Sequence, residues 1–362
     1  MRQSSKDYKR IVIKIGSSLL YKNKKLDYSI LKAISRQIVP LVKKGKEVVL
    51  VSSGAIALGM HILGLKERPR ELSHLQAVAA IGQNELMNAY RNFFNKNNFV
   101  AQILLTWEDF NSRKRYLNAQ NTLNGLMDYR KYGLTGIIPV INENDTVSTE
   151  EIKFGDNDKL SALVANLINA DFLIILSDVD GLMDKNKKTV RVVSEFTAQV
   201  KELASPTDKK TSVGGMVTKL EAAKIAVDSG IACLLANGRR RDIIFSALKA
   251  PQSSGTLFLP KRAYFELKKR WIAFGTRPKA GIIVDQGAKK ALLNKKSLLC
   301  VGVIGVKGVF ETGDIVNIID NQGCEFARGK ARISSNALDK VKGSRQAKEV
   351  IHCDNIAILN NV

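Results

Sequence analysis

Two lysines stand beside glycine-rich segments that could bind a phosphate group. Lys14 lies near the end of an apolar, strand-like run and is followed by Gly16, and Lys219 lies one turn into a helical pattern that starts after Gly214 and Gly215. Backbone N–H groups at the start of a helix, together with a lysine, form a favourable site for an anion. Each segment alone also matches many ordinary loops, so neither is specific by itself.

Two further segments carry small or polar residues directly after an apolar run. Ser53 and Gly54 follow one such run and lead into a helical pattern, and Ser177 and Asp178 follow another. The first pair suits an anion-binding helix start, although a plain serine cap would look the same. The second pair begins a tight polar turn that a simple Asp-Gly turn would explain. No GxxxxGK[ST] motif occurs in the chain, which excludes a P-loop nucleotide site.

Asparagines and carboxylates are interleaved in two short segments, residues 142–145 and 156–158. Six carboxylates fall between residues 143 and 158, which is unexpected in a chain of net charge +23. Carboxylates can bind an ammonium group, and side-chain amides can donate hydrogen bonds to a carboxylate. A solvated acidic loop would have a similar composition, but the interleaved amides favour a pocket for an amino acid.

No obvious general base accompanies these groups. The three histidines, His61, His74 and His352, are dispersed, and the four cysteines form no CxxC pair, which counts against a zinc site, a redox pair or a Ser-His-Asp hydrolase. A carboxylic acid needs no base to become a nucleophile, because a pKa of about 4.3 leaves it ionised at neutral pH. The residues therefore favour phosphoryl transfer between a nucleotide and a small polar acid.

The elements that must position these residues follow an alternating pattern. Between residues 9 and 259, apolar runs alternate with helical patterns, which predicts an α/β domain with a mostly parallel sheet covered by helices on both faces. We predict strands over residues 11–15, 47–51, 100–105, 136–141, 172–176 and 231–236, and helices over residues 75–94, 113–129, 159–168 and 216–228. Ligands of such sheets bind beyond the carboxyl ends of the strands, where these motifs lie.

A basic stretch with aromatic residues, 261–275, interrupts this pattern and reads as a connector between domains. From residue 280 onward, short apolar runs separated by glycine predict a small, barrel-like β domain with a helix at residues 288–293. We therefore expect two domains, over residues 1–262 and 278–357.

The composition is that of a globular chain, with 45% hydrophobic and 25% charged residues. The apolar runs are far shorter than the ~18 residues that span a bilayer, and the N-terminus has no signal-peptide pattern, so we expect a cytoplasmic protein without membrane contact. The net charge of +23 favours an anionic partner, which could be nucleic acid, phosphate or an acidic metabolite. A lysine-rich solvated surface is the better explanation for most of this charge.

Six segments together resemble the glutamate 5-kinase branch of the amino acid kinase family. They are KIGSS at Lys14, SSGAIA at Ser52, QAVAAIGQ at Gln76, PVINEND at Pro139, FGDNDKLSA at Phe154 and GGMVTK at Gly214. Residues 278–356 resemble the PUA domain that many members carry. The INEND segment is the most specific element, because it distinguishes this branch from aspartate, acetylglutamate and carbamate kinases. The resemblance implies a three-layer α/β sandwich, the amino acid kinase fold, and ATP-dependent phosphorylation of the L-glutamate side-chain carboxylate, the first step of proline synthesis.

The resemblance also implies a role for each site residue. The implied catalytic residues are Lys14 and Lys219, which would contact the phosphates, and Asp158, which would hold both lysines. The residues implied to bind glutamate are Ser53, Asp145 and Asn157, with Gly54, Asn142 and Lys153 close by. The residues implied to bind ATP are Lys14, Ser177, Asp178, Val213, Gly214, Gly215, Met216, Val217, Thr218 and Lys219. Mg²⁺ would bridge the phosphates with few ligands from the protein, so no protein metal site is expected.

Two positions depart from the family pattern, and both lie on the nucleotide side. Family members usually have Gly-Thr where this chain has Ser212 and Val213, and tyrosine is common where Met183 stands. The family also suggests a homodimer or tetramer formed through the kinase domain.

Two other functions stay open at this point. The first is an RNA-binding protein acting through the PUA domain, because PUA domains often occur in RNA-modifying proteins and the chain is basic. The C-terminal segment lacks the aromatic-rich surface that single-strand binders use, which makes RNA contact a secondary role. The second is a sister kinase that acts on another small carboxylic acid.

Overall fold

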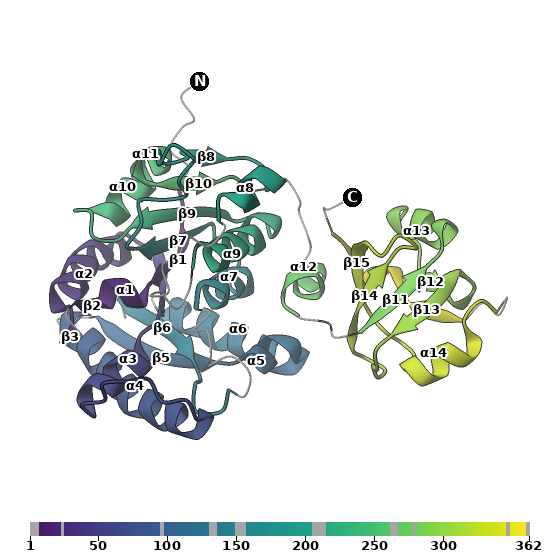
Figure 1. The fold of residues 1–362 in the computed structure, drawn as a ribbon, viewed down its shortest axis with the longest axis horizontal. Helices are drawn as coiled ribbons and strands as arrows, with labels where there is room; N and C mark the ends of the chain where they lie inside the picture. The colour runs from purple at the N-terminus through teal and green to yellow at the C-terminus, as the bar shows by residue number, and fades with distance from the viewer. Residues whose placement is uncertain are drawn as a thin grey trace. The chain divides into compact units, whose positions relative to one another are not determined.

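The chain divides by its internal contacts into two compact units, Met1–Arg262 and Ala263–Val362 (Figure 1). The computed structural model describes residues 7–22, 25–94, 98–129, 136–148, 157–204, 215–260, 267–276, 278, 280–344 and 348–359. Within these ranges, no helix combines the length and the apolar character that crossing a membrane requires.

The first unit is built on an eight-stranded sheet with the order β5-β6-β4-β1-β7-β9-β10-β8. Its strands are β1 (Arg10–Ile15), β4 (Glu47–Ser52), β5 (Phe99–Leu105), β6 (Ile137–Glu143), β7 (Phe172–Ser177), β8 (Val192–Val193), β9 (Ala232–Asn237) and β10 (Thr256–Phe258). The strands from β5 to β9 in this order pair in parallel, and β10 runs antiparallel to β9. The predicted mostly parallel sheet is therefore confirmed, with all six predicted strands in it.

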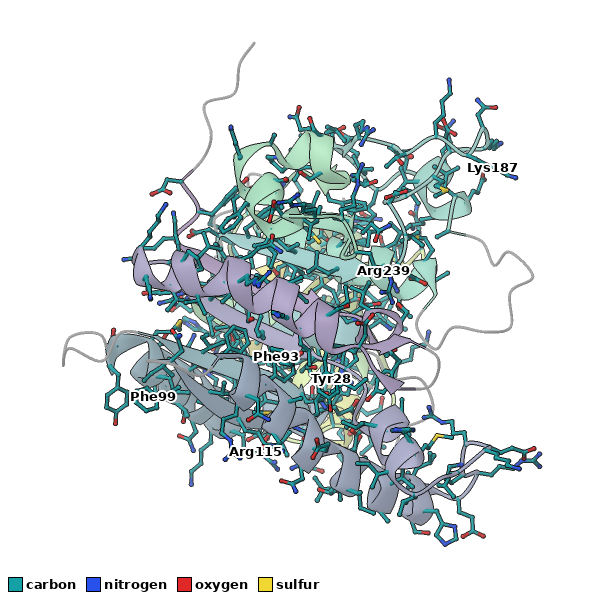
Figure 2. All side chains as sticks on the ribbon, turned by 90° about the vertical axis from the view of Figure 1, so that its left-hand side faces the viewer. Tyr28, Phe93, Phe99, Arg115, Lys187 and Arg239 are labelled. Carbon is teal, nitrogen blue, oxygen red and sulfur yellow. The ribbon has the colours of Figure 1, made fainter. Side chains whose placement is uncertain are left out.

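Helices cover both faces of this sheet (Figure 1). The helices of the first unit are α1 (Ser17–Leu20), α2 (Tyr28–Lys43), α3 (Ala55–Ile62), α4 (Leu72–Phe94), α5 (Trp107–Asn111), α6 (Arg113–Asp128), α7 (Asn157–Leu167), α8 (Ala198–Glu202), α9 (Met216–Asp228), α10 (Ile243–Lys249) and α11 (Pro251–Ser254), and a short hairpin joins β2 (Tyr21–Lys22) to β3 (Lys25–Leu26). The four predicted helices correspond to α4, α6, α7 and α9. Helix α2 was not predicted, and it lies beside α4, where the rings of Tyr28 and Phe93 are 5.9 Å apart (Figure 2).

The two faces of β1 pack against different helices. Ile13 and Ile15 belong to the hydrophobic core that the sheet shares with α2, α4 and α10. Successive side chains of a strand point to opposite faces, so Lys14 points to the other face, where α7 packs against β1. This alternation directs the Lys14 side chain toward α7.

Two glycines allow α3 and α4 to cross with their backbones almost in contact. A Cβ atom at Gly59 would lie 1.9 Å from the carbonyl oxygen of Val78, and one at Gly82 would lie 1.8 Å from that of Ala55. Only glycine fits such a close approach. Because Ala55 begins α3 directly after Ser53 and Gly54, this crossing fixes the position of that segment.

The second unit contains a five-stranded sheet with the order β13-β11-β14-β15-β17 around its own hydrophobic core. Its elements are α12 (Leu267–Phe274), β11 (Gly281–Val284), α13 (Gln286–Leu293), β12 (Leu298–Leu299), η2 (Cys300–Gly302), β13 (Val303–Lys307), β14 (Ile315–Ile319), β15 (Glu325–Lys330), α14 (Ser335–Val341), β16 (Glu349–Ile351), η3 (Cys353–Asn355) and β17 (Ile356–Ile358). The predicted β-rich domain is confirmed, and α13 includes the helix predicted at residues 288–293.

The stretch expected to be a connector is in part a structured helix. Helix α12 lies within it and buries Trp271 and Ile272. The guanidinium of Arg328 on β15 donates to the carbonyl oxygens of Ala273 at 2.8 Å and Thr276 at 3.0 Å. These hydrogen bonds attach α12 to β15 of the second unit. The burial of two large apolar side chains also favours this position, because it removes apolar surface from water.

We expect Gly82→Ala to lower the free energy of unfolding of the first unit by about 2 kcal/mol, since the new methyl group would force the α3 and α4 backbones apart. Gly125→Ala is the matched control, because Gly125 lies in α6 with nothing within 4 Å of a Cβ atom. That change should raise stability by about 0.5–1 kcal/mol. Urea denaturation of the full chain measures both, and equal effects of the two variants would contradict the close crossing.

Candidate functional site

The sequence motifs meet at the carboxyl edge of the parallel sheet. Lys14 is near the end of β1, Ser53 follows β4, Asn142 is in β6, and Ser177 ends β7. Strands β6, β4, β1 and β7 are consecutive neighbours in the sheet, which brings these residues to one edge. This is the edge at which ligands of open α/β sheets bind.

Three charged side chains form a buried cluster at the centre of this edge. Asp158, in the first turn of α7, lies between Lys14 and Lys219, with its Oδ1 2.5 Å from Lys14 Nζ and its Oδ2 3.2 Å from Lys219 Nζ. The three residues are 5%, 2% and 8% exposed in the order Lys14, Asp158, Lys219. One carboxylate therefore holds two lysines, and the cluster keeps a net charge of +1.

The ionisation of Asp158 is set by these two lysines. Burial raises the pKa of the Asp158 carboxyl, but the charges and hydrogen bonds of Lys14 and Lys219 outweigh burial, so the pKa lies below its usual value. Asp158 is therefore ionised at neutral pH and, because its pKa is lowered, it is a weak proton acceptor. It positions the lysines.

The N-terminus of α9 completes the cationic side of the site. Thr218 donates from Oγ1 to Asp158 Oδ2 at 3.1 Å, so it joins the same carboxylate as Lys219. Gly215, Met216 and Val217 precede it at the start of this 13-residue helix, whose free N–H groups favour an anion. Val213 and Gly214, which were predicted to bind ATP, and Lys153 lie outside the described residues.

A network of buried amides lies beside the charged cluster. Asn157 Nδ2 is 2.7 Å from the carbonyl oxygen of Ser52, 3.2 Å from Ser53 Oγ and 2.8 Å from Asn142 Oδ1. Asn142 in turn donates from Nδ2 to Gln83 Oε1 at 2.6 Å. The network connects β4, β6, α4 and α7, and Asn157 leads directly to Asp158 in the chain.

Gly54 has a left-handed backbone, with φ of 104°, that ends β4 and starts α3. The phenol of Tyr21 donates to its carbonyl oxygen at 2.6 Å, and a Cβ atom at Gly54 would lie 2.7 Å from the Tyr21 ring. Burial raises the pKa of Tyr21, so the phenol stays protonated and remains a donor. Tyr21 thereby holds the Ser53–Gly54 corner in place.

Asp145 lies in the turn after β6, and the pKa of its side chain is raised. Burial raises the pKa of Asp145 to about 6, although the charge of Arg68 lowers it in part. Arg68 belongs to the segment between α3 and α4. Near neutral pH the Asp145 carboxylate is thus mostly ionised, and it becomes neutral a little below the physiological range.

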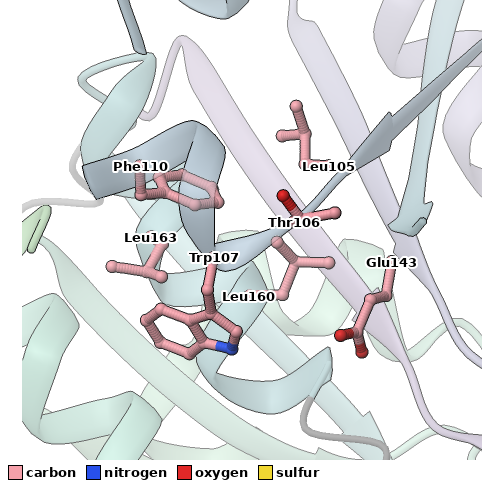
Figure 3. A pocket seen from close by; sticks show the side chains of 7 residues that line it. All are labelled: Leu105, Thr106, Trp107, Phe110, Glu143, Leu160 and Leu163. Carbon is pink, nitrogen blue, oxygen red and sulfur yellow. The ribbon is translucent and has the colours of Figure 1, made fainter. Parts of the chain in front are cut away.

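Glu143 belongs to the same INEND segment as Asp145, and it stabilises the turn after β6. It is 8% exposed, and Ser148 Oγ donates to its Oε1 at 2.9 Å. Figure 3 shows its side chain at a small pocket whose other lining residues are Leu105, Thr106, Trp107, Phe110, Leu160 and Leu163. Glu143 therefore ties the turn that carries Asp145 to the end of β6.

Ser177 and Asp178 lie on the rim beside β1. Ser177 is buried and donates from Oγ to Asp178 Oδ1 at 3.0 Å, while Asp178 is exposed. The carbonyl oxygen of Leu176 accepts from the N–H of Gly16 at 3.1 Å, which keeps the ends of β1 and β7 together.

Three residues of this site were not singled out by sequence reasoning. Tyr21 comes from the β2–β3 hairpin, Arg68 from an irregular segment, and Gln83 from the middle of α4. Gln83 ends the QAVAAIGQ segment, but the sequence offers no signal that its amide would reach Asn142 in β6, 59 positions away. Contacts of this kind depend on how α4 crosses α3 and packs on the sheet.

Two known protein families match parts of this chain. Residues 9–237 match the amino acid kinase family, and residues 281–353 match the PUA domain. The chain belongs to the amino acid kinase family. The fold and function that the sequence motifs implied for the first unit therefore agree with a match over most of that unit.

Close relatives within the amino acid kinase family share one name. A protein of Caldanaerobacter subterraneus subsp. tengcongensis named glutamate 5-kinase is 45% identical, with 97% of this chain and 98% of the relative covered. Proteins of the same name from Thermoanaerobacter sp. and Pelobacter propionicus are 43% and 42% identical, with 97% and 99% of this chain and 98% and 100% of the relative covered. The similarity thus spans both units.

We expect Asp158→Asn to lower the free energy of unfolding by about 3 kcal/mol at pH 7, because it leaves Lys14 and Lys219 buried without a counter-charge. The pKa of Asp158 is lower in the folded chain than its usual 3.8, so its stabilising effect is present above that pH and is lost as the pH falls through the folded value. Thermal or urea denaturation from pH 7 to pH 3 measures this. Asp178→Asn, at an exposed carboxylate, is the control and should change stability by less than about 0.5 kcal/mol; an equal loss would contradict the role of Asp158.

Proposed function

We propose that this chain transfers the γ-phosphoryl group of ATP to the side-chain carboxylate of L-glutamate and forms L-glutamyl 5-phosphate. The observation that carries this proposal is the buried Lys14–Asp158–Lys219 cluster beside a network of buried amides. The 42–45% identity to proteins named glutamate 5-kinase over nearly the whole chain supports it. This reaction is the first step of proline synthesis.

The proposed reaction needs charge neutralisation and alignment more than proton transfer. An oxygen of the ionised glutamate side chain attacks the γ-phosphorus, the bond from that phosphorus to the bridging oxygen breaks, and ADP leaves with the bond electrons. Lys14 and Lys219 contact the phosphoryl oxygens and stabilise their charge in the transition state. Asp158 fixes the spacing of the two ammonium groups and leaves the excess of one positive charge for the phosphates.

Glutamate would lie between the charged cluster and the turn after β6. Ser53, Gly54, Asn142 and Asn157 form the polar wall of this space, and Asp145 supplies a carboxylate for the substrate ammonium group. The side-chain carboxylate then points to the lysines, because the new bond forms there.

ATP would bind on the side of the cluster formed by β7 and α9. We assign to it Lys14, Lys219, Ser177, Asp178 and residues 213–218. The carboxylate of Asp158, at the centre of the cluster, is already paired with two lysines, so the donor set does not fit a resident metal site. Mg²⁺ fits as part of the MgATP substrate, in which phosphate oxygens and water supply most of its ligands.

Four further assignments complete this proposal. Residues 1–262 form the catalytic domain and residues 278–357 the PUA domain, which is also a candidate for RNA contact as a secondary role. The protein works in the cytoplasm. It forms a homodimer or tetramer through the first unit, where large apolar side chains are exposed at the end of α3, in the segment after it and in α4, namely Ile62, Leu63, Leu65, Leu72 and Ile81.

We expect ATP-dependent acyl phosphate formation with glutamate, and little with aspartate, acetylglutamate or carbamate, when the product is trapped as a hydroxamate.

Lys219→Ala should reduce kcat by at least ~10²-fold with a smaller effect on the glutamate KM, since the lost charge acts in the transition state. Near-normal turnover in this variant, or preference for another acid, would refute the assignment.

The pH dependence of glutamate binding should report Asp145. Its pKa of about 6 predicts that the glutamate KM rises as the pH falls below 6, because the protonated carboxyl no longer attracts the ammonium group. Asp145→Asn should raise the KM at pH 7.5 and remove this acid limb, with a smaller change in kcat. Steady-state kinetics between pH 5 and 8 measures both effects. An unaltered KM, or an acid limb that persists in the variant, would remove Asp145 from the pocket.

A further inference from the structure

The orientation of three amides in the site is fixed by one backbone group. The N–H of Glu143 donates to Asn142 Oδ1 at 2.9 Å, and a backbone N–H can only donate. The oxygen of Asn142 therefore faces this N–H and Asn157, and its NH₂ group faces Gln83 at 2.6 Å. Gln83 must meet that NH₂ group with its oxygen.

This orientation leaves two buried polar atoms without hydrogen-bond partners among the described residues. They are Gln83 Nε2, a donor, and Asn157 Oδ1, an acceptor. A buried donor or acceptor that stays unpaired costs free energy, so such atoms in a site point to a ligand that pairs them. Both amides contact Asn142, so the donor and the acceptor border the same part of the site.

We propose that Gln83 binds the α-carboxylate of the amino acid substrate through its Nε2–H groups and is a residue that determines substrate specificity. This inference rests on the proposed function and adds to it the group that recognises the substrate head. A carboxylate is an acceptor with two oxygens and suits a buried amide donor. The unpaired oxygen of Asn157 is complementary to the neighbouring ammonium group.

The position of Gln83 in the network selects the α-carboxylate over the side-chain carboxylate. Gln83 is joined to Asn142, and Asn142 to Asn157, which precedes the Asp158 of the charged cluster. Gln83 is thus at the end of the network that lies away from the lysines. The reacting side-chain carboxylate must lie near the lysines, so the α-carboxylate is the group that can reach Gln83. Asn142 is also three residues from Asp145, and the ammonium group that Asp145 attracts is attached to the same carbon as the α-carboxylate.

A substrate exchange separates recognition from a structural role. In isoglutamine the α-carboxylate is replaced by a neutral amide of the same shape, while the ammonium group and the side-chain carboxylate remain. Gln83→Glu keeps an oxygen for Asn142 and replaces the donor by an anion, which repels the α-carboxylate but can accept from the α-amide of isoglutamine. Asn84→Asp is the matched control, since it makes the same chemical change at the next, exposed position of α4.

The measured quantity is kcat/KM for glutamate divided by that for isoglutamine, from the hydroxamate assay with competition where turnover is slow. We expect Gln83→Glu to lower this ratio at least tenfold, because a hydrogen bond to a charged group is worth about this much or more, while Asn84→Asp leaves it unchanged. A Gln83→Glu variant that folds and loses activity with both substrates equally would overturn the inference, because it would show a structural role or a contact to the side-chain carboxylate.

The outcomes also distinguish this inference from the proposed function. Normal glutamate phosphorylation by the unchanged protein, with a ratio that Gln83→Glu does not alter, refutes the role of Gln83 and leaves the function standing. Absence of any glutamate-dependent product from the unchanged protein refutes both. If Gln83→Glu does not fold, Gln83→Leu tests the same ratio, which should again fall, because an apolar side chain removes the donor without placing a charge in the site.

Discussion

The burial of two lysines against one aspartate is the interaction on which the rest of the site depends. An unpaired buried charge is strongly unfavourable, so Lys14 and Lys219 can lie inside the protein only where Asp158 meets both. The three residues come from a strand and two helices that are far apart in the sequence. The packing of α7 on β1 and β7, and of α9 on α7 and β9, is thus a condition for the site. In the proposed function, the excess of one positive charge would give the cluster its affinity for phosphate.

The amide network adds the second half of the site without adding charge. Asn142 and Asn157 connect the ends of β4 and β6 to α4 and α7, and the crossing of α3 and α4 at Gly59 and Gly82 sets where α4 can present Gln83. Cations and amides therefore face one space from different elements. A substrate with one anionic reacting group and a zwitterionic head fits this division. In the proposed function, the lysines would bind the phosphates, and the amides and Asp145 would bind the head.

Much of the fold could be predicted, because apolar periodicity reports burial directly. The six predicted strands and four predicted helices all occur, since buried parallel strands are short apolar runs and surface helices have one apolar face. Several other helices were missed, among them α2, α10 and α12. The composition of α12 is basic, so its sequence does not indicate that Trp271 and Ile272 are buried. Their burial depends on the strands of the second unit.

The sequence by itself determined which residue types reach the sheet edge, because a strand alternates faces and residues after a parallel strand lie at its carboxyl end. That was enough to select Lys14, Ser53, Asp158 and Lys219 with their family resemblance. The family resemblance already implied that Asp158 holds both lysines. Only the tertiary structure decided the distances at which it does so, that burial moves the pKa of Asp145 to about 6, and that Gln83 Nε2 is buried without a hydrogen-bond partner among the described residues. Each of these depends on distances between elements that no local pattern encodes.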